Sequence, residues 1–411
     1  MQMTTAESQT SLPFIELESQ FSAHNYHPLP VVLSRGQGVY VWDVDGKKYY
    51  DFLSGYSALN QGHCHPKIIS TLIQQAQRLT LTSRAFHNDQ YAEYARFITS
   101  FFGYDKVLPM NTGVEAVETS IKLARRWGYD VKGIQENKAR IIVFENNFHG
   151  RTSTVISFSS DPSAYTGFGP YMPGFDLIPY NDLSALAKAL QNKDVAAVLM
   201  EPIQGEAGVV VPETGYLSKA YEYCKQANVL FIGDEIQTGL GRTGKMLACD
   251  HENVRPDILI LGKALSGGVL PISAVLADDE IMLTIKPGEH GSTYAGSPLA
   301  SALAITALTV LKNENMTENA ALMGNYFREG LESLKSPFIE TIRGKGLLNA
   351  VVIHQNHPEL AWDLCLILKE NGLLAKPTHG NKIRFAPPLI ISKIQMDECL
   401  EIIEDSLAVL K

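Results

Sequence analysis

The distribution of apolar positions along the chain predicts alternating strands and helices through its central part. Short, nearly continuous apolar runs of the length of buried strands occur at five places. Stretches with apolar residues at three- and four-residue spacing, such as 183–190 and 216–227, lie between these runs. This alternation predicts an α/β fold with a mostly parallel sheet that is covered by helices on both faces. The five predicted strands span residues 141–144, 195–200, 229–232, 258–261 and 272–276.

The N-terminal part has a different pattern. Residues 13–35 are predicted to be irregular, because two prolines within residues 28–30 exclude a helix there. Residues 38–52 alternate around Asp45-Gly46, a strong turn signal, and predict a β-hairpin. A helical pattern follows over 66–79.

The C-terminal part predicts one long helical region over 299–334 and then a lobe of mixed strand and helix, with strands at 350–353 and 382–385. We therefore expect a large domain and a smaller α+β domain to which both ends of the chain contribute. The expected division is an N-terminal segment over 1–60 that joins the small domain, a large domain over 61–320 and a C-terminal small domain over 321–411.

Composition and charge narrow the class of protein. Apolar residues make up 45% of the 411 and charged residues 19%, as in ordinary globular enzymes. The net charge of −9 argues against generic binding of nucleic acid, which needs a basic face. The five scattered cysteines indicate a reducing compartment. Residues 1–12 contain no Arg or Lys and resemble neither a signal peptide nor a transit peptide, so a cytoplasmic protein is expected.

Two predicted central strands each end in a residue with chemical potential. Asp234 follows the run at 229–232, and Lys263 follows the run at 258–261. Ligands of α/β sheets bind outside the carboxyl ends of the strands, where both side chains are expected. A lysine in apolar surroundings there loses affinity for its proton and becomes a usable nucleophile. The alternative is an ion pair between two surface loops, which is common and contributes little.

A helix that begins near Gly113 offers a second signal, because residues 111–113 precede an apolar stripe that runs to 127. A helix N-terminus with free N–H groups binds phosphate readily, although an ordinary capped helix has the same pattern. A P-loop would need Gly at 257 and Ser or Thr at 264, where the chain has Asp257 and Ala264. The sequence His63-Cys64-His65 has no further ligands to complete a metal site, so we expect none.

Six short motifs, each with at least one glycine, lie in order along the chain. They are NTGVEA (111–116), NFHGRT (147–152), EPIQGEAG (201–208), DEIQTGLGRTG (234–244), LGKALSGG (261–268) and GEHGSTYAG (288–296). Together these stretches resemble those of the pyridoxal-phosphate-dependent class III aminotransferases, and the resemblance runs from about Tyr26 to Pro388. It implies the aspartate-aminotransferase type of fold, known as fold type I, and pyridoxal 5′-phosphate as cofactor.

The resemblance also implies roles around that cofactor. Lys263 is expected to bind the cofactor aldehyde covalently and then to shuttle a proton. Asp234 is expected to face the pyridine nitrogen and keep it protonated, and Gln237 to donate to the phenolic oxygen. Phe148 is expected to stack on the ring, with His149 beside it. The expected phosphate contacts are the backbone N–H groups of Gly113 and Val114 and the hydroxyls of Ser292 and Thr293, the latter two from a neighbouring subunit of a homodimer or a larger assembly.

Within this class, HNYHPLP, LLAKPTHG and IRFAPP resemble the members that transfer the δ-amine of ornithine to 2-oxoglutarate and form glutamate. The resemblance implies that Tyr26 and Arg151 hold the α-carboxylate of ornithine. Arg384 is expected to hold the α-carboxylate of glutamate or 2-oxoglutarate, with Tyr56 in the same pocket. Glu206 is expected to mask Arg384 while ornithine reacts.

Two alternatives remain open. A related aminotransferase acting on N-acetylornithine or 4-aminobutyrate would share most of these motifs, and Tyr26 is the residue expected to discriminate, since it suits a free α-amino acid end. A non-catalytic binding protein with the same fold would be expected to lose Lys263 or Asp234, and both are present.

Overall fold

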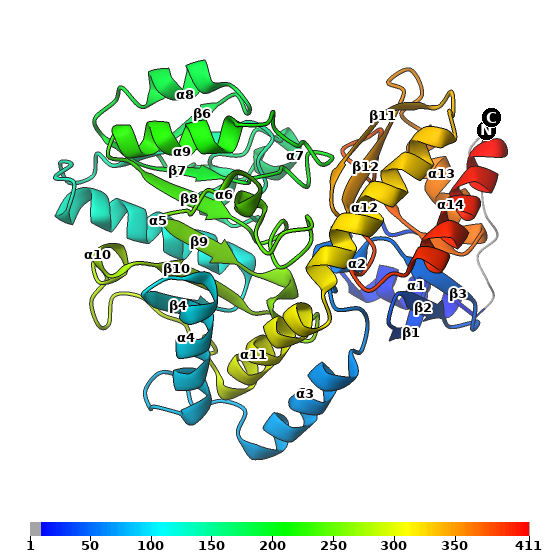
Figure 1. Ribbon diagram of the computed structural model, residues 1–411, viewed down its shortest axis with the longest axis horizontal. Helices are drawn as coiled ribbons and strands as arrows, with labels where there is room; N and C mark the ends of the chain where they lie inside the picture. Colours follow the sequence, from blue (N-terminus) through cyan, green and yellow to red (C-terminus); the bar gives the residue numbers. More distant parts are fainter. Residues whose placement is uncertain (1–9, 411) are drawn as a thin grey trace.

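A computed structural model describes residues 10–410, which form one seven-stranded sheet and two four-stranded sheets (Figure 1). The seven-stranded sheet has the order β4-β10-β9-β8-β7-β5-β6, in which all pairs from β9 to β6 are parallel and β10 is antiparallel to both of its neighbours. The mostly parallel sheet predicted from the sequence is therefore confirmed. Its strands are β4 (Lys106–Met110), β5 (Arg140–Phe144), β6 (Phe175–Ile178), β7 (Val195–Met200), β8 (Leu230–Asp234), β9 (Ile258–Leu261) and β10 (Ser273–Ala277).

The five predicted strands are the five inner strands, and the two that the apolar pattern did not predict, β4 and β6, lie at the edges. Inner strands are covered on both faces and so appear as continuous apolar runs. Edge strands need no such run: β4 contains Pro109, and Leu177 in β6 is exposed.

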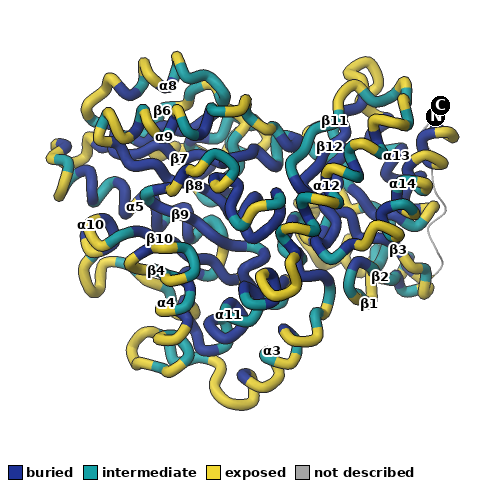
Figure 2. Tube along the Cα trace, viewed as in Figure 1, coloured by how far each residue is buried: buried dark blue, intermediate teal, exposed yellow. Residues whose placement is uncertain are grey.

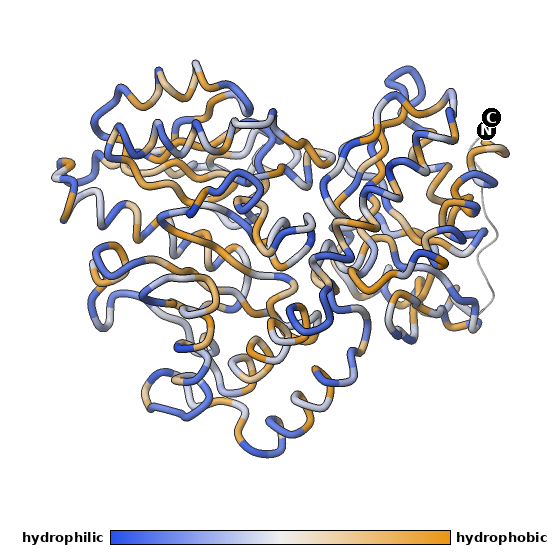
Figure 3. The backbone as a smooth tube through the Cα atoms, in the orientation of Figure 1, coloured by the Kyte–Doolittle hydropathy of each residue, from blue (hydrophilic) through white to orange (hydrophobic). Residues whose placement is uncertain are grey.

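Helices cover both faces of this sheet, and alternate residues of one strand show the two layers. In β7, Ala197 and Leu199 pack with the long helix α5 (Gly113–Asp130), whereas Val198 and Met200 pack with α8 (Leu183–Ala189) and α9 (Tyr216–Gln226). Figure 2 shows the resulting buried centre, and Figure 3 shows apolar residues along the strands. The sheet is thus a rigid support for the loops at its strand ends.

Both four-stranded sheets lie on the other side of the molecule (Figure 1). The N-terminal sheet has the order β1-β2-β3-β13, and β13 from the C-terminal part pairs in parallel with β3. The hairpin predicted over residues 38–52 is confirmed by the antiparallel pair β2–β3. Its strands are β1 (Leu33–Gln37), β2 (Tyr40–Asp43), β3 (Lys48–Asp51) and β13 (Leu373–Leu374).

The C-terminal sheet has the order β11-β12-β15-β14 and is packed against two helices, so the α+β prediction for this part is confirmed. Strands β12 and β15 match the predicted ones. In the sheet, β15 is an inner strand that lies between β12 and β14. The elements are β11 (Ile339–Lys345), β12 (Leu348–Ile353), α13 (Leu360–Glu370), β14 (Lys376–Thr378), β15 (Lys382–Phe385) and α14 (Lys393–Ala408).

Two expectations about local structure are wrong. The segment 13–35 is not irregular throughout, because α1 (Leu12–Phe21) occupies its first part, with a proline in its first turn; residues 28–30 carry no helix, as expected. The long helical region over 299–334 is two helices, α11 (Pro298–Asn313) and α12 (Met316–Ser333), because Asn315 between them adopts a left-handed conformation with φ 50°.

The remaining elements are short or lie at the periphery. The predicted helix at 66–79 is α3 (Pro66–Arg78). The others are α2 (Ser54–Ser57), α4 (Asp89–Phe102), α6 (Ser153–Ile156), α7 (Pro162–Tyr165), α10 (Asp279–Met282) and the 3₁₀ turns η1 (Ala248–Glu252) and η2 (Lys263–Ser266). Across residues 10–410, none of the helices combines the length and the apolar character needed to cross a membrane.

Candidate active site

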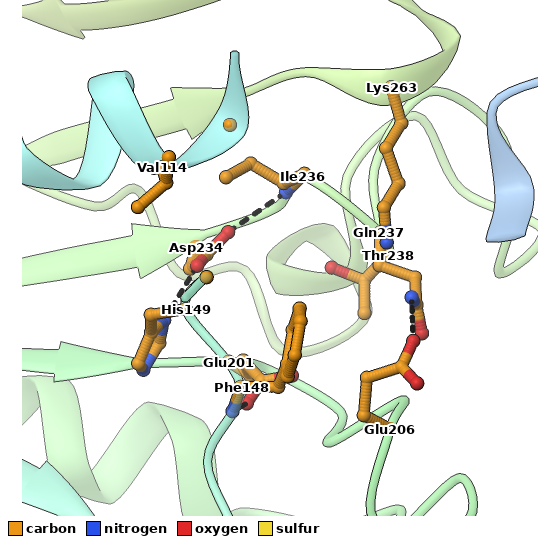
Figure 4. Close-up of a pocket in the computed structure, with 12 residues that line it drawn as sticks. Val114, Phe148, His149, Glu201, Glu206, Asp234, Ile236, Gln237, Thr238 and Lys263 are labelled. Atoms are coloured by element: carbon orange, nitrogen blue, oxygen red, sulfur yellow. Dashed lines mark hydrogen bonds and ion pairs between the residues drawn. The ribbon is translucent and has the colours of Figure 1, made fainter. Parts of the chain in front are cut away.

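A cavity of about 200 Å³ opens at the carboxyl ends of β7, β8 and β9, next to the N-terminus of α5 (Figure 4). Parallel strands end at the same edge of the sheet, so residues far apart in sequence meet there. Eight of the residues singled out from the sequence line this cavity. They are Gly113, Val114, Phe148, His149, Glu206, Asp234, Gln237 and Lys263, and Gly150, Glu201, Ile236 and Thr238 complete the lining.

Lys263 enters the cavity directly after β9. The backbone turns sharply there, with Lys263 at φ 44°, at the start of η2. Desolvation lowers the pKa of Lys263 to about 8, although the negative charges of Glu206 and Asp234 act in the opposite direction. A substantial fraction of this amine is therefore neutral near physiological pH, as a nucleophile or a proton acceptor requires.

Asp234 ends β8 and is held on two sides. Its Oδ2 lies 2.7 Å from His149 Nδ1, and its Oδ1 accepts the backbone N–H of Ile236 at 3.1 Å (Figure 4). Burial alone would lower the pKa of His149, but the hydrogen bond and charge of Asp234 outweigh it and raise the pKa. Both side chains are buried, so the pair presents a fixed carboxylate at the base of the cavity.

The N-terminus of α5 forms another wall. Thr112 caps the helix in a capping box with Glu115, whose backbone N–H donates to Thr112 Oγ1 at 3.3 Å. The first N–H groups of a helix, here those of Gly113 and Val114, have no partner within the helix and point beyond its end. Both residues line the cavity, which makes this end a ready site for a phosphate.

A cluster of three side chains closes the other end. Glu206 Oε1 accepts from Arg384 Nη1 at 2.7 Å and from Gln237 Nε2 at 2.9 Å, and Arg384 Nη1 also donates to Gln237 Oε1 at 3.2 Å. Burial alone would raise the pKa of Glu206, but Arg384 and Lys263 outweigh it and lower the pKa to about 2. Glu206 is therefore charged at any physiological pH, and Arg384 is masked by it.

Arg384 keeps unused binding capacity behind this mask. Its guanidinium is 1% exposed and lies 4.9 Å from the centre of the Tyr56 ring. Among residues 10–410, Arg384 Nε has no hydrogen-bond partner. A planar guanidinium binds a carboxylate through two parallel bonds, so Arg384 is equipped to receive another carboxylate when Glu206 moves aside.

A second cavity of about 260 Å³ adjoins the first and shares Phe148, His149, Gly150 and Glu206 with it. Arg151 lines this outer cavity, with its guanidinium carbon 5.6 Å from the centre of the Phe148 ring. His379 and Lys382 line the opposite side. A substrate that reacts at Lys263 therefore has room to extend toward these cations.

Five of the residues expected at the site line neither cavity, and two of them, Arg384 and Tyr56, belong to the cluster around Glu206. Tyr26 is 69% exposed and lines a separate cleft of the N-terminal segment, whereas burial and the charge of Glu206 raise the pKa of Tyr56. Ser292 accepts a hydrogen bond from Asn111 Nδ2 at 2.7 Å, just before α5, and Thr293 beside it is exposed. The role expected for the last two involves a second copy of the chain, and it stays a prediction.

Glu201 is a residue of the cavity that the sequence did not single out. It directly follows β7, is buried, and accepts the backbone N–H of Phe148 at 2.8 Å. Burial raises the pKa of Glu201 to about 7. Two features of the sequence could have indicated Glu201: it comes directly after a predicted strand, and it belongs to the motif that also contains Glu206.

The histidines considered as metal ligands have other partners. His63 lies 2.7 Å from Asp51 and His65 lies 3.1 Å from Glu314. In the part of the chain that the structure describes, no group of three or more His, Cys, Asp or Glu residues could hold a metal ion.

Comparisons with known proteins agree in one family. The sequence profile of the family "Aminotransferase class-III" matches residues 21–407. The mitochondrial ornithine aminotransferase of Rattus norvegicus is 61% identical over 392 residues, which are 95% of this chain and 89% of that protein.

Solved structures give the same picture. An ornithine aminotransferase from Toxoplasma gondii, with PLP in partial occupancy at its active site, superposes with a TM-score of 0.97 at 50% identity, covering 98% of this chain and 95% of that one. The acetylornithine aminotransferase of Elizabethkingia anophelis superposes with a TM-score of 0.89 at 57% identity, covering 97% and 99% of the two chains.

Proposed function

The chain belongs to the class III aminotransferases, and from that premise we propose the reaction it catalyses and the residues that carry it. It is an ornithine δ-aminotransferase, which transfers the δ-amino group of L-ornithine to 2-oxoglutarate and forms L-glutamate 5-semialdehyde and L-glutamate. The observation that carries the proposal is the Glu206–Arg384 pair beside Lys263, because a maskable arginine suits an enzyme with two unlike substrates.

The cofactor is pyridoxal phosphate, and the residues of the cavity fit it. The partly desolvated amine of Lys263 suits the cofactor aldehyde, and the buried carboxylate of Asp234 suits the ring nitrogen. The free N–H groups at the start of α5 suit the phosphate. An added Cβ at Gly113 would lie 3.1 Å from Ile236, so the backbone and Ile236 pack tightly where α5 begins. When bound, the cofactor supplies an electron-withdrawing ring that stabilises negative charge on the substrate carbon bearing the reacting amine.

Around that ring the proposed work is divided among the residues of the cavity. Lys263 would hold the cofactor through its Nζ until the amine of the substrate displaces it. The freed Nζ would then take the proton from the substrate carbon that bears the reacting amine and deliver it to the cofactor carbon that had been bonded to Nζ. Asp234 holds a proton at the ring nitrogen, supported by His149. Phe148 covers one face of the ring, Gly113 and Val114 bind the phosphate, and Gln237 contacts the phenolic oxygen once it leaves Glu206.

Selection between the two amino acids is assigned to Glu206. While Glu206 covers Arg384, an α-carboxylate has no arginine to bind there, so ornithine enters with its δ-amine first. Its α-carboxylate then lies in the outer cavity, where Arg151 binds it with the help of Tyr26. When Glu206 turns away, Arg384 receives the α-carboxylate of glutamate or 2-oxoglutarate, with Tyr56 against its guanidinium.

A homodimer completes the proposed site. Ser292 and Thr293 of the second copy would add hydroxyls to the phosphate contacts made by Gly113 and Val114. The position of Ser292 next to Asn111, at the residue before the helix cap, supports a role for this loop near α5. The proposed domain division remains 1–60, 61–320 and 321–411. It is supported by the seven-stranded sheet, whose strands all lie within 106–277, and by β13, which joins the C-terminal part to the N-terminal sheet.

We place the protein in the cytoplasm. All five cysteines are free, which suits a compartment that keeps thiols reduced. The rat relative is named as mitochondrial, so the alternative is the mitochondrial matrix. Fractionation of the source cells, with detection of the chain by antibody, distinguishes the two.

One experiment tests the reaction and its substrate. The purified enzyme is given 2-oxoglutarate with ornithine, N-acetylornithine or 4-aminobutyrate in turn, and glutamate is measured in each case. We expect ornithine to give a kcat/KM at least about tenfold above the others, because Arg151 and Tyr26 are proposed to bind a free α-amino acid end in the outer cavity. The semialdehyde should cyclise to pyrroline-5-carboxylate, which is measured separately.

The second candidate is an N-acetylornithine aminotransferase, which the Elizabethkingia relative favours. A higher kcat/KM with N-acetylornithine than with ornithine would establish it in place of the first. No glutamate from any of the three donors would refute both.

A further inference from the structure

Lys382 lies on the same strand and the same face as Arg384. Side chains alternate along a strand, so residues 382 and 384 of β15 point to one side, about 7 Å apart. Both are in the paired part of the sheet, where Lys382 is opposite Val352 and Arg384 is opposite Ala350. The strand therefore carries two cations in a row, with Arg384 inside and Lys382 toward the outer cavity.

The stem of Lys382 is held in place by the loop that carries Glu206. Gly208 has φ +93°, and a Cβ there would lie 2.2 Å from Lys382 Cδ, so only glycine leaves room for the lysine. Thr378, opposite Lys382 in β14, donates to the backbone oxygen of Glu206 at 3.1 Å. The position of Lys382 thus depends on the loop that masks Arg384.

The ammonium group of Lys382 lacks a carboxylate partner. Its Nζ makes only long contacts, 3.3 Å to the His379 carbonyl and 3.4 Å to Asn381 Oδ1. Within residues 10–410 no carboxylate lies within 4.0 Å of it. Burial and the charge of Arg343 lower the pKa of Lys382, while Glu340 acts in the opposite direction.

Arg151, across the same cavity, is likewise without a carboxylate within 4.0 Å in the described chain. Two acids line this cavity with them. Asp161 is already bound by the N–H and hydroxyl of Ser163, at 2.9 Å and 2.8 Å, and Glu206 is paired with Arg384. Lys382 is partly buried and Arg151 is exposed, and neither has a carboxylate at ion-pair distance, which favours an anionic ligand between them.

We propose that Lys382 is a specificity-determining residue that binds the second carboxylate of the dicarboxylic substrate while Arg384 binds the first. The inference rests on the proposed function, in which Arg384 takes the α-carboxylate of glutamate or 2-oxoglutarate. The end carboxylates of an extended five-carbon chain lie on the order of 5 Å apart. That span matches two cations about 7 Å apart at their Cα atoms on one strand face.

Ornithine makes much less use of Lys382. The end of ornithine that reaches the outer cavity carries an ammonium group beside its carboxylate, and repulsion of that ammonium by Lys382 offsets attraction of the carboxylate. Lys382 therefore favours the dicarboxylic substrate of the second half of the reaction over ornithine, the substrate of the first. Glu206 discriminates between the same two substrates by masking Arg384, whereas Lys382 does so by attracting the oxo acid.

The test compares Lys382→Met, which keeps the stem against Gly208 but removes the charge, with Lys382→Arg, which restores it. We expect Lys382→Met to raise the KM for 2-oxoglutarate about five- to tenfold, as the loss of one charge-assisted contact predicts, with the KM for ornithine changed less than about twofold. The Ki of glutarate, a dicarboxylate that cannot react, should rise in parallel. Lys382→Arg should restore both values.

The matched control is Lys376→Met, in the same sheet at the position opposite Arg384 and outside both cavities. An unchanged KM for 2-oxoglutarate in Lys382→Met would overturn the proposal. So would equal increases for both substrates, or an equal effect of Lys376→Met. Failure of the proposed function is distinguishable, since the unaltered enzyme would then prefer N-acetylornithine to ornithine or give no glutamate from either.

Discussion

Two ion pairs of the same length face the same cavity, but they are held in different ways. Asp234 and His149 lie 2.7 Å apart, and so do Glu206 and Arg384. Asp234 ends β8, and His149 lies in the loop that follows β5 of the same seven-stranded sheet. Glu206 follows β7 of that sheet, whereas Arg384 lies on β15 of the C-terminal sheet.

This difference separates a fixed pair from an exchangeable one. Asp234 is held at the end of a packed inner strand, and both it and His149 are buried, with side chains 4% and 1% exposed. Glu206 is partly exposed on a loop, and Gln237 lies within hydrogen-bond distance of both members of its pair. The fixed pair is suited to hold a proton at one atom, and the exchangeable pair to admit one substrate at a time.

Lys263 lies between the two pairs, and removing its amine tests whether either pair can support the chemistry alone. We expect Lys263→Ala to lower kcat with ornithine by at least about 10⁴-fold, as in other enzymes that lose their nucleophile. The thermal midpoint should stay close to that of the unaltered protein, since Lys263 has no ion-pair partner in the described chain. A loss of less than about a hundredfold would remove Lys263 from the chemistry, and Lys376→Met serves as the control for loss of a partly buried lysine.

Breaking the fixed pair should slow both substrates equally. Asp234→Asn keeps the size of the side chain but removes the charge that we propose holds a proton at the ring nitrogen, and we expect a loss of about 10²- to 10⁴-fold in kcat. The kcat/KM values for ornithine and glutamate should fall by the same factor. His149→Asn should cause a smaller loss in the same direction. A change in preference between the two amino acids would contradict the assignment of Asp234 to chemistry alone.

Breaking the exchangeable pair should change preference more than rate. Glu206→Gln removes the charge that masks Arg384, so glutamate gains access in both halves of the reaction and ornithine is captured by its α-carboxylate. We expect the ratio of kcat/KM for glutamate over ornithine to rise about 10- to 100-fold. The measurement is a single-turnover reaction with each amino acid alone. An unchanged ratio would show that Glu206 does not select the substrate.

The sequence predicts the fixed pair better than the exchangeable one, for physical reasons. Continuous apolar runs locate the inner strands, and a residue at the end of an inner strand faces the site, which is how Asp234 and Lys263 were found. Glu206 and Arg384 were identified through the resemblance to the class III aminotransferases and have no local sequence pattern of their own. Their contact depends on how two sheets pack against each other, which a local pattern does not encode. The same holds for Lys382, whose place beside Gly208 has no trace in its own segment. Glu201 was missed because an acid after a strand is common.

Tyr26, Ser292 and Thr293 show a different limit. Their expected roles require a bound substrate or a second copy of the chain, and the single chain leaves them outside both cavities. Edge strands β4 and β6 were missed because partial exposure removes the apolar run on which the prediction depends.

The smallest expected effect concerns pH. The two pairs should differ in how far each shifts the pKa of Lys263. Its pKa is lowered from 10.5 to about 8, so the neutral amine prevails above about pH 8. The rate at which cofactor-free enzyme captures pyridoxal phosphate should therefore rise about tenfold from pH 7 to pH 9, since the neutral fraction rises by that factor. The measurement is the growth of the cofactor's visible absorbance after mixing.

The two acids should move this profile by different amounts. Among the charges that raise the pKa of Lys263, Glu206 contributes more than Asp234, whereas Arg384 lowers it. Glu206→Gln leaves Arg384 without its counter-charge, so the midpoint should move to lower pH. Asp234→Asn should move it in the same direction by less. Because the pKa of Glu206 is about 2, its own titration does not enter between pH 7 and pH 9. A larger shift in Asp234→Asn would mean that the fixed pair controls the charge of Lys263, which would reverse the roles assigned to the two pairs.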